Sequence, residues 1–206
     1  MVTSAKYVFR TIEPIILASV SPRRKELLHS MGLVFEIVPS NSDESRSCGA
    51  SPNAAALNWS REKAGLVADL YPNKWVLAAD TIVVQEDQIL GKPRDPQDAR
   101  TMLGRLSGKM HKVITGICLI RNDRRFERTE AVETQVRFKH LTEREIEAYV
   151  LTGEPLDKAG AYGIQGMGAF MVESVDGSYT NVVGLPLCKT LSWLLELGVI
   201  EPRASE

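Results

Sequence analysis

The sequence predicts an α/β protein with a mixed sheet and flanking helices. Short apolar runs typical of buried strands occur among amphipathic helical segments, but without the strict strand–helix alternation of a parallel sheet. Several strand pairs are separated only by short polar turns, which indicates antiparallel hairpins. The 206 residues, 44% of them hydrophobic, suffice for one packed core, so we expect one domain, 1–206, with one lobe or two.

The first predicted elements are two strands with a helix between them. The apolar run 14–20 predicts a buried strand, and the alternating segment 34–40 predicts a second strand. Ser21 is suited to the N-cap of the helix and Pro22 to its first turn, while Gly32 is suited to its end.

The next segments predict a loop, a helix and a hairpin. The polar stretch 40–53 predicts the loop, and a helix is expected over roughly 53–70. Helical spacing places one stripe of this helix inward, made of Trp59, Lys63, Leu66 and Leu70. The run 75–84 predicts a strand, and Glu86–Asp87 is suited to turn it into a short return strand.

The second half of the chain predicts three helices and a long hairpin. A helix starts at Asp95 and Pro96, and its inward residues are Ala99, Met102, Leu103 and Leu106. Segments 111–120 and 128–138 predict the hairpin, and a capping box is formed by Thr142 and Glu145. Two strand-like pieces around 163–175 and a turn at Asp176–Gly177 precede a last helix at roughly 186–197, with its inward residues Leu187, Leu191 and Leu194.

Two arginines occupy an unfavourable place in the first helix. Arg23 and Arg24 lie in its first turn, where the free N–H groups already carry about half a positive charge. Arginines that are merely solvated are one explanation. The other is a bound anion: a helix N-terminus and two guanidinium groups suit a phosphate chain, to which Ser19 can add a hydroxyl.

Two charged residues fall on apolar elements. Asp80 lies inside the apolar strand "VLAADTIVV", where a carboxylate needs a partner, a hydrogen bond or a metal. A structural aspartate bonded to backbone N–H groups explains it equally well. Lys63 lies on the inward stripe of its helix, where a lysine more often extends to the rim than binds a ligand. Thr81, beside Asp80, is able to bond a ligand but is also ordinary in a strand.

Two irregular segments hold further candidates. In "LGKPRD", Lys92 follows a glycine that permits a close backbone approach. The glycine-rich stretch "DKAGAYGIQG" contains Asp157, Lys158 and Gln165, and such loops often carry function. Together these candidates supply cationic groups for phosphates and carboxylates for a divalent metal, which is the equipment for phosphoryl chemistry.

Composition excludes several other classes. The net charge of −1 argues against a nucleic-acid binder, and the chain has no apolar run that would span a membrane and no secretory signal pattern. The odd cysteine count gives neither a disulfide framework nor a zinc spacing, so we expect a reduced, cytoplasmic protein. The histidines show no metal spacing and are interpreted as structural: His29, His111 and His140.

Six segments together resemble the Maf family, the septum-formation-inhibitor-like nucleoside triphosphate pyrophosphatases. They cover nearly the whole chain apart from an N-terminal extension, 1–14, and the last several residues: "LASVSPRRKELL", "AADTIVV", "ILGKPRD", "LSGKMHKVITG", "EPLDKAGAYGIQG" and "GSYTNVVGLPL". The resemblance implies a fold like that of the inosine triphosphate pyrophosphatases and a homodimer. It also implies Mg²⁺- or Mn²⁺-dependent hydrolysis of a nucleoside triphosphate to the monophosphate and pyrophosphate.

The resemblance also implies roles for individual residues. Asp80 matches the proton acceptor of the family, although a role as metal ligand remains open. Glu44 matches an acidic position that helps with metal or water. The substrate-binding positions are matched by Ser19, Arg23, Arg24, Lys63 and Lys92, and the positions linked to substrate choice by Arg23, Thr81 and Gln165.

The stretch around Gln165 resembles the dTTP/UTP subgroup rather than the 7-methyl-GTP subgroup. An amide suits a pyrimidine because it can donate to a carbonyl and accept from the N3–H of thymine or uracil. Modified pyrimidine nucleotides with the same edge are also compatible. The alternative function is a nucleotide-binding regulator of cell division with little turnover.

Overall fold

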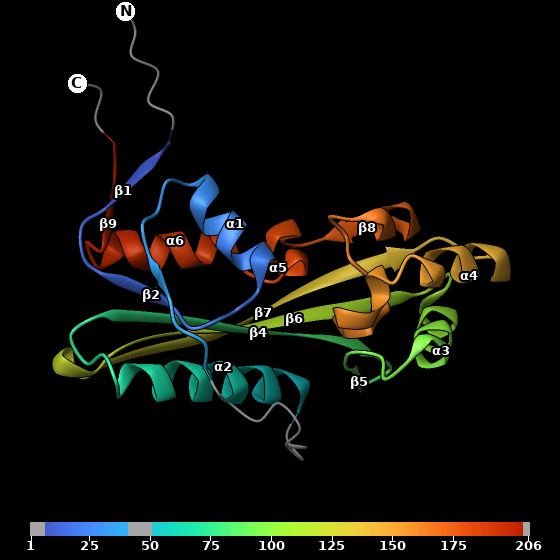
Figure 1. Ribbon diagram of the computed structural model, residues 1–206, viewed down its shortest axis with the longest axis horizontal. Coiled ribbons are helices and arrows are strands. Elements are labelled where there is room, and N and C mark those ends of the chain that lie inside the picture. The colour runs from blue at the N-terminus through green and yellow to red at the C-terminus, as the bar shows by residue number, and fades with distance from the viewer. Residues whose placement is uncertain (1–6, 41–50, 204–206) are drawn as a thin grey trace, which may run out of the picture.

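The chain folds around one mixed sheet. The structure is a computed structural model that describes residues 7–40 and 51–203. Its main sheet has seven strands in the order β3-β2-β4-β6-β7-β8, with β5 beside β4 (Figure 1). The strands are β2 (Ile15–Leu17), β3 (Glu36–Ile37), β4 (Trp75–Gln85), β5 (Gln88–Leu90), β6 (Met110–Arg121), β7 (Phe126–Phe138) and β8 (Val172–Asp176).

Parallel and antiparallel pairs share this sheet, as predicted. Strand β2 pairs in parallel with β3 and β4, while β4, β6, β7 and β8 form antiparallel pairs. The long β6–β7 hairpin confirms the prediction made from 111–120 and 128–138. The β4–β5 turn is also confirmed, because Glu86 and Asp87 both adopt positive φ angles, of 49° and 61°.

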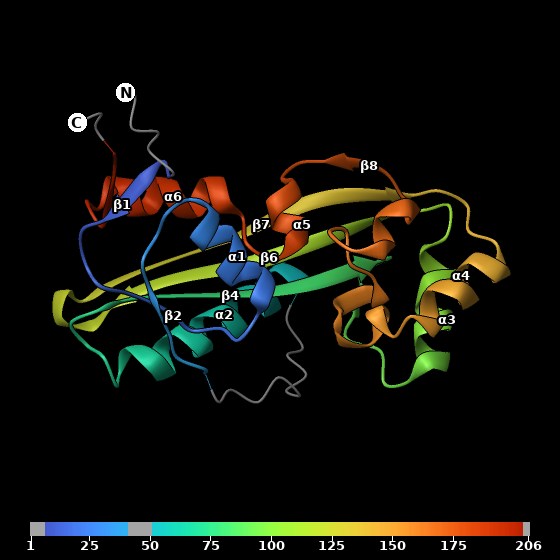
Figure 2. The same cartoon turned by 45° about the horizontal axis from the view of Figure 1, so that its top comes forward.

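Helices cover both faces of the sheet and one of its ends. Helix α2 (Pro52–Ala68) lies on one face, and α1 (Pro22–Ser30), α5 (Tyr179–Val183) and α6 (Leu187–Glu196) lie on the other (Figure 1). Helices α3 (Pro96–Leu106) and α4 (Glu143–Leu151) pack together at the far end of the strands, as Figure 2 shows. Four short 3₁₀ turns complete the fold: η1 (Asn122–Arg124), η2 (Glu154–Asp157), η3 (Ala159–Ala161) and η4 (Met167–Met171).

A separate two-stranded ribbon joins the ends of the described chain. Strand β1 (Phe9–Thr11) pairs antiparallel with β9 (Ile200–Pro202). An ion pair between Arg10 and Glu201 links the same two strands. The helices of the described residues include none long and apolar enough to cross a membrane.

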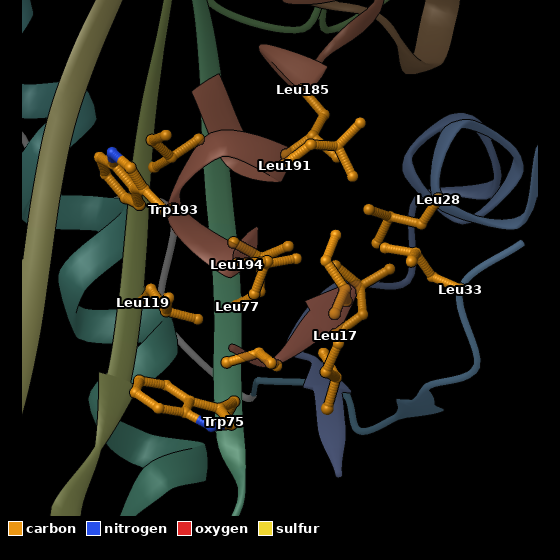
Figure 3. Packing of buried hydrophobic residues seen from close by; sticks show 14 of the residues in the cluster. Leu17, Leu28, Leu33, Trp75, Leu77, Leu119, Leu185, Leu191, Trp193 and Leu194 are labelled. Carbon is orange, nitrogen blue, oxygen red and sulfur yellow. The ribbon is translucent and has the colours of Figure 1, made fainter. Parts of the chain in front are cut away.

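Buried clusters lie on both faces of the sheet, one of them between the sheet and the helices on its α1 face. Figure 3 shows Leu28 of α1 and Leu194 of α6 converging on β2 and β4 side chains such as Leu17 and Leu77. A second buried cluster, containing Leu103, lies between α3, α4 and the far end of the sheet. The inward faces predicted for α3 and α6 are confirmed, with Met102 partly buried and the other predicted residues buried.

Helix α2 turns a different face inward from the predicted one. Leu66 and Leu70 are 46% and 72% exposed, whereas the small residues Ala55, Ala56, Ala64 and Ala68 are buried. The helix packs too closely on β6 for large side chains, since a Cβ on Gly116 would lie 2.2 Å from the Ala56 carbonyl oxygen. The prediction of an inward leucine stripe was therefore wrong, although Lys63 does face inward and is 7% exposed.

Three smaller predictions need correction. Segment 34–40 forms only the two-residue strand β3, whose side chains are exposed. The first of the two strand-like pieces around 163–175 is irregular and ends in the turn η4, and only β8 is a strand. Ser21 is the N-cap of α1, but its side chain makes no capping hydrogen bond. By contrast, the Thr142–Glu145 capping box is present.

Candidate active site

A gap along one edge of the sheet creates the site. Strand β2 pairs with β4 only at 75–77, and β5 pairs with β4 only at 83–85. Within the described part of the chain, no strand lies beside residues 78–82 on that edge. A pocket of about 570 Å³ lies here, lined also by the N-terminus of α1, the segment 157–165 and the end of α5. This volume is within the usual range of small-molecule sites.

The predicted site residues meet in this pocket. All eight that fall in the described part of the chain line it: Ser19, Arg23, Arg24, Lys63, Asp80, Thr81, Lys92 and Gln165. The ninth, Glu44, lies outside the described residues. Residues as far apart in sequence as 19 and 165 thus share one cavity, a convergence that scattered, solvated charges would not produce.

Arg24 is held in place by oxygen atoms from three elements. Its Nε donates to the Gly184 carbonyl at 2.7 Å, Nη1 to Ser19 Oγ at 3.0 Å and Nη2 to Thr81 Oγ1 at 3.1 Å. These three acceptors are oxygen atoms that fix the orientation of the guanidinium group. The first turn of α1 therefore presents a fixed positive charge to the pocket, in addition to its free N–H groups.

A buried hydrogen-bond network supports Thr81 from behind. Thr81 Oγ1 and Thr115 Oγ1 are 2.9 Å apart, and Thr115 donates to the Asn181 carbonyl at 3.1 Å. The Asn181 amide in turn donates to the Val113 carbonyl and to Thr134 Oγ1, each at 3.0 Å. The network links β4, β6, β7 and α5 below the pocket floor, although Asn181 Oδ1 is buried without a hydrogen-bond partner among the described residues.

Lys63 and Asp80 form an ion pair at the pocket wall. Their side chains are only 9% and 13% exposed, and the Lys63 ammonium donates to Asp80 Oδ1. The interpretation of Lys63 as a rim lysine is thus wrong, and so is that of Asp80 as a carboxylate tied only to backbone N–H groups. Removing either partner would leave a largely buried charge, which is strongly destabilising.

Another part of the pocket wall is built from the irregular segment after α4. Lys158 Nζ donates to Asp157 Oδ1 at 2.6 Å and to the Glu154 carbonyl at 2.8 Å. The bond from Lys158, with a smaller contribution from the positive charge of Arg23, lowers the pKa of Asp157. Gln165 lies exposed on this wall, beside Gly163 and Ile164.

The donor set is compatible with a divalent metal. Asp80 places a carboxylate among cationic side chains suited to phosphates, and Mg²⁺ usually binds one or two carboxylates together with substrate phosphates. Among the described residues, no three Asp, Glu, His or Cys side chains form a metal cluster. In the described part of the chain, two carboxylates line the pocket, those of Asp80 and Asp157.

Sequence reasoning missed the residues that support the site. Thr115, Asn181 and Gly184 lie in segments that carry the family resemblance, but they were given no role because they are uncharged and lie in ordinary strand or helix contexts. Trp59 was placed on a buried stripe, but it is only partly buried and lines the pocket. The one signal available was the polar run "GSYTNVVG", which is richer in hydroxyl and amide groups than a buried segment requires.

Fold and site together define an α/β protein whose pocket suits an anion, because it is lined by arginine and lysine side chains together with the carboxylates of Asp80 and Asp157. Comparison with known families makes the assignment specific. The family described as Maf-like protein matches residues 14–197, and the chain belongs to this family, as the sequence motifs predicted.

Two curated relatives that are similar to this chain are both named dTTP/UTP pyrophosphatase. A dTTP/UTP pyrophosphatase from Geotalea uraniireducens (strain Rf4) is 50% identical over 91% of this chain and 96% of its own. The dTTP/UTP pyrophosphatase from Myxococcus xanthus (strain DK1622) is 47% identical over 93% of this chain and 96% of its own. Among solved structures, the Staphylococcus aureus Ham1 protein matches with a TM-score of 0.40 and 13% identity, over 78% of this chain and 80% of that one.

Proposed function

We propose that this protein is a nucleoside triphosphate pyrophosphatase that hydrolyses dTTP and UTP to the monophosphate and pyrophosphate. Modified pyrimidine nucleotides with the same base edge fit the same proposal. The names of the curated relatives support it. The observation that carries it is the convergence of Arg23, Arg24, Lys63 and Lys92 on one pocket with Asp80 in its wall.

The cationic residues suit the triphosphate. Arg24 is oriented by its bonds to Ser19, Thr81 and Gly184, so its positive charge is in place before the substrate binds. Arg23 adds a second guanidinium on the same helix turn, and Lys92 approaches from the loop after β5. Because phosphoryl transfer depends mainly on positioning and charge neutralisation, such preorganised groups supply much of the catalysis.

Asp80 and Lys63 suit the hydrolytic step. Water oxygen bonds to the α-phosphorus, the bond from that phosphorus to the bridging oxygen breaks, and pyrophosphate leaves. The proton released by the water needs an acceptor, and Asp80 provides a carboxylate in the wall of the pocket. Lys63, now paired with Asp80, can also neutralise charge that develops on the phosphates.

A divalent metal, Mg²⁺ or Mn²⁺, is part of the proposal. Asp80 would hold it together with the substrate phosphates, and Glu44 is the proposed second carboxylate. When bound, the metal would polarise the phosphoryl oxygens and neutralise their charge. An Asp80 that binds the metal is a weaker base, so its two proposed roles compete.

Gln165 is proposed to read the base. It lines the same pocket as the Lys63–Asp80 pair, and its amide can donate and accept at the edge of thymine or uracil. Thr81 and Arg23 are the other proposed contributors to substrate choice. The homodimer and the cytoplasmic location remain predictions, made from the family resemblance and from the cysteine pattern respectively.

A turnover panel in H₂¹⁸O tests the function. The protein is mixed with Mg²⁺ or Mn²⁺ and dTTP, UTP, CTP, GTP, ATP or 7-methyl-GTP, and the products are separated. We expect monophosphate and pyrophosphate, fastest from dTTP or UTP, with the label in the monophosphate. Asp80→Asn is expected to lower kcat by ~10²–10⁴-fold. Asp157→Asn, which changes a second pocket carboxylate, is the matched control and is expected to lower it far less.

Three other results of the turnover panel would each contradict the proposal in a different way. Nucleoside diphosphate and inorganic phosphate would move cleavage to the β–γ bond and contradict the proposed chemistry. Label in pyrophosphate would move the attack to the β-phosphorus. Tight nucleotide binding without turnover, followed through the fluorescence of Trp59 in the pocket wall, would favour the regulator of cell division.

A further inference from the structure

A carboxylate outside the pocket organises the segment that carries Gln165. The side chain of Glu154, at the start of η2, accepts hydrogen bonds from the backbone N–H groups of Met167 at 3.0 Å and Gly168 at 3.2 Å. It also accepts one from the Tyr149 hydroxyl at 2.9 Å. Neither Glu154 nor Tyr149 lines the pocket. Their contacts therefore act on the loop rather than on a ligand.

Tyr149 and Glu154 together also hold the backbone that precedes Gln165. The Gly163 N–H donates to the Tyr149 hydroxyl at 3.2 Å, while Met167 and Gly168 bond to Glu154. Gln165 thus lies in a short arc whose two ends are held by one hydrogen-bonded unit, Tyr149–Glu154. A loop with both ends fixed loses much of its conformational freedom before a ligand arrives.

Close packing shows that this unit shapes the arc. A Cβ on Gly166 would lie 2.5 Å from Glu154 Oε1, and one on Gly168 would lie 2.7 Å from the Tyr149 hydroxyl oxygen. The backbone on both sides of Gln165 therefore lies directly against the two side chains. At Gly168 a Cβ would also lie 2.8 Å from the Gly163 carbonyl oxygen, whereas at Gly166 it would meet only the Glu154 carboxylate and displace it from its donors.

The hydrogen bonds also keep the anchor ionised. Burial alone would raise the pKa of Glu154, but the N–H groups of Met167 and Gly168, with the Tyr149 hydroxyl, lower it below its usual range. An ionised carboxylate only accepts hydrogen bonds, which is what three converging donors require. A glutamine at this position would turn an N–H group toward one of these donors.

We propose that Glu154, acting together with Tyr149, is the positioning residue for base recognition: it fixes the 163–168 arc so that Gln165 is preorganised to read the pyrimidine edge. This inference rests on the proposed function. It assigns selectivity between bases to a residue that touches no substrate. The phosphate-binding residues Arg24 and Lys63 belong to α1 and α2, so we expect the chemical step to be largely independent of Glu154.

Steady-state kinetics of Glu154→Gln test the inference. With dTTP and CTP as substrates, we expect the ratio of their kcat/KM values to fall by about fourfold, close to the loss expected on removing the Gln165 side chain itself, mainly through a higher KM for dTTP. The kcat for dTTP is expected to change by less than about threefold, because its determinants lie elsewhere. The matched control is Glu147→Gln, which removes a carboxylate of α4 that pairs with Arg100 away from the arc. It should leave both values unchanged.

A second variant and a second measurement keep the inference falsifiable if Glu154→Gln folds poorly. Tyr149→Phe removes the hydroxyl that bonds to Gly163 and Glu154, and it should lower the dTTP/CTP ratio in the same direction by a smaller factor. Amide exchange at Met167 and Gly168 should become faster in both variants. Unchanged selectivity in both variants, with wild-type turnover intact, would overturn the role of Glu154. Absence of turnover in the wild type would instead overturn the proposed function.

Discussion

The two ends of the pocket are built in different ways. The end proposed for the phosphates is formed by regular elements: the first turn of α1, the centre of β4 and the inward face of α2. The end proposed for the base is formed by 154–171, a succession of 3₁₀ turns and glycines. Each end nevertheless has one charged group held by three hydrogen bonds, Arg24 at the first and Glu154 at the second.

This difference indicates how chemistry and selectivity are separated. At the phosphate end the charged group held by hydrogen bonds, Arg24, itself lines the pocket. A change that moves Arg24 therefore also changes its contact with a bound ligand. At the base end the anchored charge is outside the pocket and acts through the backbone. The second end can therefore vary while the reaction stays unchanged, and loops that vary on a rigid scaffold commonly set specificity; Arg23 and Thr81 are the proposed contributors to substrate choice from the first end.

A change of pH should affect the base end first. His111 of β6 is buried and bonded to the hydroxyl of Tyr162 at 2.9 Å, and burial lowers the pKa of its imidazole from 6.5 to about 4. The unfolded chain therefore takes up this proton at a higher pH than the folded one. The contribution of His111 to the folding free energy is therefore fully present above pH 6.5 and is lost as the pH falls through about 4, by about 3 kcal/mol in all.

Urea unfolding at pH 7, 5.5 and 4.5 measures this loss. The variant His111→Gln keeps a polar group that can bond Tyr162 but cannot titrate, so its stability should change less between these values. If the free energy of unfolding depends equally on pH in the wild type and in His111→Gln, titratable groups other than His111 cause the loss. Faster amide exchange near Tyr162 than near Arg24 at low pH would confirm that the base end loosens first.

Arg24→Ala should weaken the phosphate end without changing the base preference. Loss of charged hydrogen bonds to phosphate is expected to lower kcat/KM by about 30-fold, or about 2 kcal/mol, with KM raised and kcat lowered for every nucleotide alike. The control is Arg94→Ala, which removes an exposed guanidinium paired with Asp98. An unchanged rate in Arg24→Ala would remove this residue from the proposed site.

Gln165→Ala should have the smallest effect, confined to the choice of base. The loss of neutral hydrogen bonds to the pyrimidine edge is expected to cost about 1 kcal/mol, so discrimination between dTTP and CTP should fall by about fivefold. The kcat for dTTP should change less than the selectivity does. Full selectivity in this variant would mean that other residues of the pocket wall recognise the base. Base recognition would then not belong to the segment that carries Gln165.

Sequence patterns predicted the phosphate end better than the base end, for physical reasons. Arg23, Arg24 and Asp80 stood out because helix dipoles and apolar strands make charges unfavourable at their positions. The inward face of α2 was misjudged because its contact with β6 depends on Gly116, which is remote in sequence. The anchor Glu154 escaped notice because an acidic residue beside a turn is ordinary; its partners, Met167 and Gly168, become neighbours only in the folded chain.

The ribbon of β1 and β9 has a mechanical consequence. Phe9 pairs with Pro202 at the outer end of this antiparallel ribbon, so the two chain ends leave it side by side. A force that pulls these ends apart loads the hydrogen bonds one after another, as in opening a zipper, rather than all together in shear. The ribbon would therefore yield at low force and lengthen, while the seven-stranded sheet and the pocket at the edge of β4 still bear little load.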